Sequence, residues 1–94
     1  MEFSEFEASL THSSPPAGLS PLAKALWLDR KGEFDAAHSI AQEISSEDGA
    51  RIHAYLHRKE GDLGNAGYWY RRARDTMPSE SLEHEWEALV RRLL

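Results

Sequence analysis

The chain has 94 residues, of which 40% are apolar, with a formal net charge of −5 and no cysteine. This length and apolar content suffice for one modest core, so we expect a single domain. The lack of cysteine excludes disulfides and thiolate metal sites and suits a reducing cytoplasm. The acidic balance argues against a general affinity for nucleic acid. No apolar run approaches the ~18 residues of a membrane span, and the acidic N-terminus differs from a signal peptide, so we expect a cytoplasmic protein without membrane contact.

Residues 1–19 are expected to form a flexible arm. They combine the turn-forming run Ser13–Pro16 with only a few scattered hydrophobic residues, too sparse to nucleate a core. Phe3, Phe6 and Leu10 do lie at helical spacing. A short helix that docks on the rest of the chain is therefore the alternative.

Residues 20–94 are expected to fold as one all-α domain of about five helices. Ser20 followed by Pro21 is a strong helix start, and Gly32 and Gly61 are the kind of residue that ends a helix. The periodicity of the apolar residues places the helices at about 21–31, 33–45, 47–60, 63–76 and 80–93. The fourth of these has the cleanest apolar stripe and is expected to be the central packing helix, and the fifth is expected to cap the stack.

The glycine motif recurs after 29 residues. Gly32-Glu33-Phe34 with Ala37 aligns with Gly61-Asp62-Leu63 with Ala66. The second of these units resembles the second half of a tetratricopeptide repeat, on these positions: Gly61, Asp62, Leu63, Ala66, Tyr70, Ala73 and Pro78. The run from Ala66 to Ala73 is also similar to the end of a Sel1-like repeat. The resemblance covers about residues 21–78 and implies stacked helical hairpins that bind proteins through a concave face lined by the first helix of each unit.

The resemblance also implies where a partner would bind. Residues 51–78 are locally cationic in an otherwise acidic chain, with six basic and three acidic side chains. Forked guanidinium contacts to carboxylates make an acidic peptide or acidic protein the expected partner. The candidate binding residues on the third and fourth helices are Arg51, Tyr55, Arg58, Lys59, Tyr68, Arg71 and Arg72. The alternative is an ordinary solvated face whose arginines pair with acids of the same chain.

Two histidines suggest a second class of function. His53 and His57 are four residues apart, so both imidazoles lie on one face of the expected helix at a spacing that suits zinc or nickel. A third ligand would have to come from His38, His84 or Glu85. The alternative to a metal-binding or metal-sensing domain is that both rings occupy polar packing positions.

The sequence holds no sign of catalysis. It has no thiol nucleophile, no Gly-x-Ser-x-Gly motif and no glycine-rich phosphate loop, so we expect a non-enzymatic protein without a cofactor. A third hypothesis is a self-associating structural subunit. Two repeats leave apolar hairpin faces at the ends of a stack, which a homodimer would cover.

Overall fold

The computed structural model describes all 94 residues and consists of helices joined by turns and loops, without a strand. The expected all-α class is confirmed, with six helices where about five were expected. The helices are α1 (Phe3–Ser9), α2 (Pro21–Arg30), α3 (Phe34–Glu43), α4 (Glu47–Lys59), α5 (Leu63–Arg72) and α6 (Leu82–Leu93). None of them is long and apolar enough to cross a membrane.

Serine side chains begin three of the helices. Ser20, Ser46 and Ser81 each accept a hydrogen bond from the backbone amide three residues later, at 3.0 to 3.3 Å. A hydroxyl in this position satisfies one of the amides that the first helical turn leaves without a partner. The starts of α2, α4 and α6 are therefore encoded locally.

The two glycine turns have the same geometry. Gly32 and Gly61 adopt left-handed φ angles of 86° and 83°, a conformation that costs other residues energy because of their Cβ atom. In both turns the amide after the glycine donates to the carbonyl five residues earlier, at 2.9 Å. The hairpins α2–α3 and α4–α5 therefore repeat at the 29-residue interval seen in the sequence.

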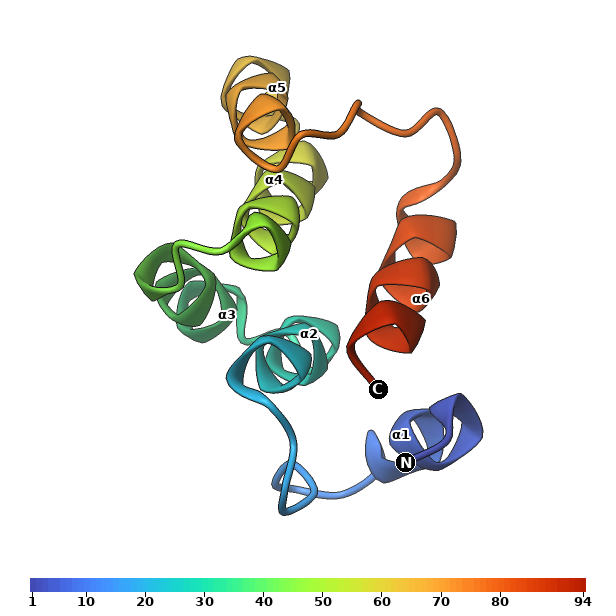
Figure 1. Cartoon of the computed structure of the whole chain (residues 1–94). Coiled ribbons are helices and arrows are strands. Elements are labelled where there is room, and N and C mark those ends of the chain that lie inside the picture. Colours follow the sequence, from blue (N-terminus) through green and yellow to red (C-terminus); the bar gives the residue numbers. More distant parts are fainter.

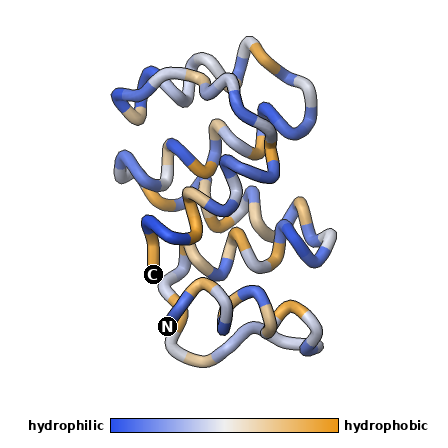
Figure 2. Tube along the Cα trace, turned by 90° about the vertical axis from the view of Figure 1, so that its right-hand side faces the viewer, coloured by the Kyte–Doolittle hydropathy of each residue, from blue (hydrophilic) through white to orange (hydrophobic).

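The first four large helices follow one another along an arc, and α6 lies on the inner side of that arc (Figure 1). A linker over residues 73–81 carries the chain from α5 across to α6, which packs against α2 and α4. Figure 2 shows that hydrophobic positions gather in the middle of the molecule more than at the α5 end. The last helix thus fills the inner side of the arc and leaves α5 uncovered.

The main core is formed by α1, α2, α3, α4 and α6, with Leu26, Leu56 and Trp86 among its almost fully buried side chains. Helix α5 contributes instead to a small separate cluster with α4, made of Ala54, Ala66 and Tyr70. The expectation that the fourth predicted helix is the central packing helix is therefore wrong. It is peripheral because α6 covers α2 and α4 and not α5.

The N-terminal segment contains the short helix α1, which packs on the core, the arrangement that the sequence left as the alternative to a flexible arm. Phe6 of α1 is completely buried, and its ring centroid lies 5.9 Å from that of Trp86. The hydroxyl of Ser9 accepts a hydrogen bond from the indole of Trp27 at 3.0 Å, and Lys31 donates to the carbonyls of residues 10 and 12. The ring of Phe3 lies at the same distance from Trp86, so two aromatic side chains and a few polar links anchor the segment despite its low hydrophobic content.

Helix α5 ends earlier than the predicted 63–76. Arg74 has a left-handed φ angle of 59°, and the amide of Asp75 donates to the carbonyl of Tyr70 at 2.9 Å, so the chain turns out of the helix there. Met77, which directly follows the predicted range, lies in the linker and is 36% exposed. The apolar periodicity continued past the point where the chain has to turn toward α6.

Candidate functional site

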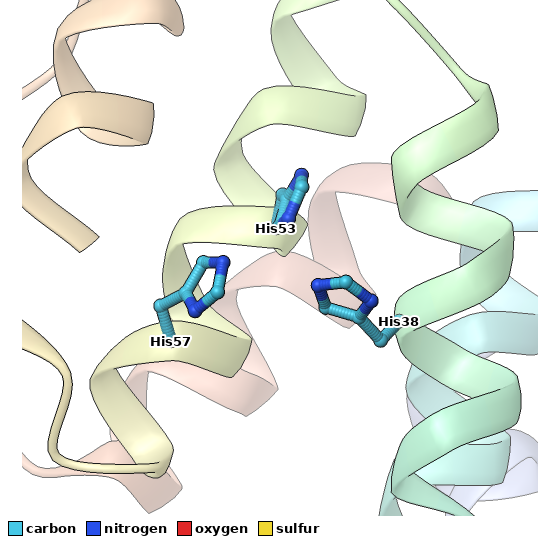
Figure 3. Close-up of side chains that lie close together, drawn as sticks. All are labelled: His38, His53 and His57. Carbon is cyan, nitrogen blue, oxygen red and sulfur yellow. The ribbon is translucent and has the colours of Figure 1, made fainter. Parts of the chain in front are cut away.

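Three histidines from two neighbouring helices converge on one point. His38 comes from α3, and His53 and His57 come from successive turns of α4 (Figure 3). One ring nitrogen of each lies within 4.8 Å of the others. The ring centroids are 4.6 Å apart for His38 and His53 and 4.8 Å apart for His53 and His57. Of the third ligands that the sequence left open, the structure brings His38 to the pair.

A carboxylate orients one ring of this trio. Nδ1 of His57 lies 3.0 Å from Oε1 of Glu60, and Oδ2 of Asp62 is 4.0 Å from the same nitrogen. In the neutral tautomer that donates Nδ1–H to this carboxylate, Nε2 keeps a free lone pair. Figure 3 shows this ring turned toward His38. Metal-binding histidines are commonly held by such a carboxylate on the nitrogen away from the ion.

The second ring is held by stacking. His53 is 5% exposed, and its imidazole stacks on the indole of Trp69 with centroids 4.0 Å apart and planes 21° apart. Burial and the charges of His38 and His57 lower the pKa of His53 to about 4. The neutral ring, which is the form that ligates metals, is therefore dominant at neutral pH.

Solvent reaches the nitrogens of the trio. No buried side-chain nitrogen or oxygen lacks a hydrogen-bond partner, and among the three rings only His57 bonds to another protein group. The nitrogens of His38 and His53 must therefore be open to water. Ligand nitrogens about 3.3 Å apart would surround a tetrahedral zinc ion, so the rings need to approach by no more than about 1.5 Å.

The other candidate ligands lie elsewhere. His84 is an exposed residue of α6. Glu85 points into the protein, where its carboxylate accepts hydrogen bonds from Arg58 at 2.8 Å and from the hydroxyl of Tyr70. The remaining histidine, His12, is exposed in the turn after α1. The candidate metal site therefore contains His38 and the two histidines of α4, without these groups.

Four of the seven expected partner-binding residues are engaged by acids of the chain itself. The hydroxyl of Tyr55 and the ammonium of Lys59 both donate to the buried Asp29, at 3.0 and 2.8 Å. Arg58 pairs with the buried Glu85 of α6. These residues tie α4 to α2 and α6, and removing one member of a buried pair such as Arg58–Glu85 typically costs ~3–5 kcal/mol. The expected open basic groove is therefore absent at these positions.

Arg51 is held in the same way at the other end of α4. Its guanidinium lies 2.9 Å from carboxylate oxygens of both Asp48 and Asp75, and its side chain is 14% exposed. The hydrogen bond from Arg51 holds the pKa of the Asp75 carboxyl below its usual value. This arginine joins α4 to the linker that follows α5. The sequence predicted that Arg51 would bind an acidic partner, but its charge is neutralised within the chain.

The buried acids themselves were missed by the sequence reading. Asp29 follows the apolar run of Leu26, Trp27 and Leu28, and Glu85 falls on the stripe of α6 that includes Leu89. An acid within an apolar stripe is the available signal for a buried ion pair. Such a signal predicts that a cation of the same chain will approach, and here α4 supplies it.

The other three expected binding residues share the outer surface of α5. Tyr68 is 44% exposed, and Arg71 and Arg72 are exposed. One guanidinium nitrogen of Arg72 donates to the hydroxyl of Tyr68 at 3.1 Å, and the same group lies over the ring of Trp69. Neither arginine is among the residues that form ion pairs within the chain. This surface is the remaining part of the basic and aromatic face.

A hollow of about 570 Å³ opens between the linker over residues 73–81 and α6. Its wall contains Arg51 and Arg92, both paired with Asp48, together with the apolar side chains of Met77 and Leu89. Because its cations already have carboxylate partners, the hollow has no strong preference for an acidic ligand.

Searches with family models, among curated proteins and among solved structures found no match to this chain.

Proposed function

We propose that this protein binds a divalent transition-metal ion through His38, His53 and His57. The observation that carries the proposal is the convergence of three imidazole nitrogens, within 4.8 Å of one another, from two helices. Imidazole suits zinc, nickel and copper, and three histidines leave a fourth position for water or another ligand. Hard cations such as magnesium, which prefer oxygen ligands, are excluded by the same chemistry.

The surroundings of the trio support this function. Glu60 holds the ring of His57 in the orientation that frees Nε2, and the indole of Trp69 supports the ring of His53. A metal ion there would link α3 to α4, which belong to different hairpins. Binding should therefore stabilise the fold, because an ion that binds only the native state adds its binding free energy to folding.

Calorimetric titration of tag-free protein with Zn²⁺, Ni²⁺ and Cu²⁺ tests the proposal. We expect one ion per chain with micromolar or tighter affinity, weakened by at least about tenfold in His38→Ala. His12→Ala and His84→Ala are the matched controls, because they remove an exposed histidine outside the trio and should leave binding unchanged. Equal weakening in all three variants, or no binding by the wild type, would mean that the rings merely pack together.

We also propose that the two hairpins are tetratricopeptide-like units. The support is the 29-residue period shared by their glycine turns and by fully buried alanines, Ala25 with Ala54 and Ala37 with Ala66. Small residues at such positions let two helices approach closely. Ala25→Leu and Ala54→Leu should therefore each destabilise the fold by ~1–3 kcal/mol in urea unfolding, and tolerance of either would argue against equivalent packing in the two units.

A further inference from the structure

Helix α1 docks on α2 and α6 through a compact set of contacts. The rings of Phe3 and Phe6 each lie 5.9 Å from the ring of Trp86, measured between centroids. The hydroxyl of Ser9 accepts the hydrogen bond from the indole of Trp27. Because these contacts come from α1 itself, the α1 of any copy of this chain can make them on α2 and α6 of any other copy.

The hydrogen bonds that hold α1 in shape are local. The amide of Glu2 donates to the carboxylate of Glu5 at 3.2 Å, and the hydroxyl of Ser9 donates to the carbonyl of Phe6 at 2.6 Å. The helix can therefore move as a unit. Its seven residues are too few for a stable isolated helix in water, so it needs a surface that buries its aromatic rings.

Residues 13–18, the hinge, join α1 to the rest of the chain by a loosely held segment. No backbone hydrogen bond ties the hinge to any helix, and four of its six residues are exposed. Figure 1 shows it looping away from the other helices. Pro15 and Pro16 favour an extended chain, because a proline disfavours the helical conformation in the residue before it. Fully extended, the hinge spans about 20 Å, so it can carry α1 to a neighbouring molecule.

The closed form, in which α1 lies on its own chain, requires a left-handed residue in the hinge. Gly18 has a φ angle of 85°, and a Cβ atom added there would meet nothing within 4 Å. The turn therefore depends on backbone conformation and not on packing. A residue with a side chain at this position would disfavour the turn, and with it the return of α1 to its own chain.

We propose that α1 exchanges between two copies of this chain, so that the α1 of each copy docks on α2 and α6 of the other. The docked surfaces are those already formed within one chain, and only the hinge changes conformation. The exchange is independent of the proposed metal site, whose residues lie in α3 and α4. A short tether holds α1 at an effective concentration in the millimolar range, so exchanged dimers of the wild type form only near about 1 mM.

Sedimentation velocity of metal-free protein, from about 10 µM to 1 mM, measures the exchange. Gly18→Val should dimerise at least about tenfold more tightly than the wild type, because the closed hinges of both copies are strained and both are released in the dimer. Its mass should rise from 10.7 kDa toward twice that value. Ala17→Val places valine at the neighbouring exposed residue, where φ is not left-handed, and should match the wild type.

A mixture of isotope-labelled and unlabelled Gly18→Val chains shows whether α1 itself crosses to the other copy. Isotope-filtered nuclear Overhauser spectra of the dimer should show contacts between Phe6 of one copy and Trp86 of the other. This readout leaves the core unchanged, so a folding defect does not complicate it. A Gly18→Val variant that dimerises no more than Ala17→Val overturns the proposal, and so does a dimer in which Phe6 contacts only the Trp86 of its own chain.

Discussion

Replacing Phe6 with alanine asks whether α1 is part of the core. The side chain is 0% exposed and packs beside Trp86, so the change removes a whole ring from a closed environment. Phenylalanine to alanine changes in cores typically cost ~3–5 kcal/mol. At ~0.05–0.15 kcal/mol per residue, a chain of 94 residues is stable by roughly 5–14 kcal/mol. The variant should therefore lose between about a fifth and nearly all of its stability.

Urea unfolding followed by circular dichroism measures this loss directly. The midpoint should fall strongly while the slope with denaturant stays close to that of the wild type. Met1→Ala, which shortens a side chain that is 54% exposed in the same segment, should change the free energy of unfolding by less than about 0.5 kcal/mol. A similarly small effect of Phe6→Ala would show that residues 1–19 are the flexible arm that their composition suggested.

Three further outcomes are expected. Glu60→Gln removes the charge that orients one ring of the trio, so calorimetry should show a metal affinity lower by ~10–100-fold. An unchanged affinity would mean that this carboxylate does not orient the ring. Gly49→Ala would place a Cβ atom about 2.1 Å from the carbonyl oxygen of Ile44, so the urea midpoint should fall by an amount equivalent to ~1–3 kcal/mol. Because the pKa of Asp75 is lowered, its pairing with Arg51 stabilises the fold fully above pH 3.8 and is lost below it. Unfolding of Arg51→Gln should accordingly depend less on pH in that acidic range than unfolding of the wild type, by under about 1 kcal/mol because the pair is partly exposed.

The helices of residues 20–94 could be predicted because their signals are local. Ser20 caps the helix that it was expected to begin, and Gly32 and Gly61 end the helices that they were expected to end. Each signal acts through hydrogen bonds or a backbone conformation within a few residues. The exception is the end of α5, where the left-handed Arg74 has no signal as plain as a glycine.

The ion-pair partners of the charged side chains could not be predicted, because they depend on how the helices pack. Lys59 meets Asp29 from 30 positions away, and Arg58 meets Glu85 from 27 positions away. The helical pattern of α4 places these cations on one side, but it does not say that the acids of α2 and α6 face them. Most of the expected ligand groove is consequently a set of internal ion pairs.

The histidine site could be predicted in part from the sequence. The four-residue spacing of His53 and His57 was visible in the sequence, since it follows from one helix. The arrival of His38 depends on the packing of α3 against α4, so it was only one of three open choices. The docking of α1 was likewise one of two alternatives, because the helical spacing of Phe3 and Phe6 was visible but their contact with Trp86 depends on packing.

X-ray absorption spectroscopy of the zinc-loaded protein tests the proposed metal site most directly. The account predicts three nitrogen ligands at about 2.0–2.1 Å, and the loss of one imidazole from the spectrum in His38→Ala. A first shell made only of oxygen, or a spectrum that is the same in the wild type and in His38→Ala, would contradict it.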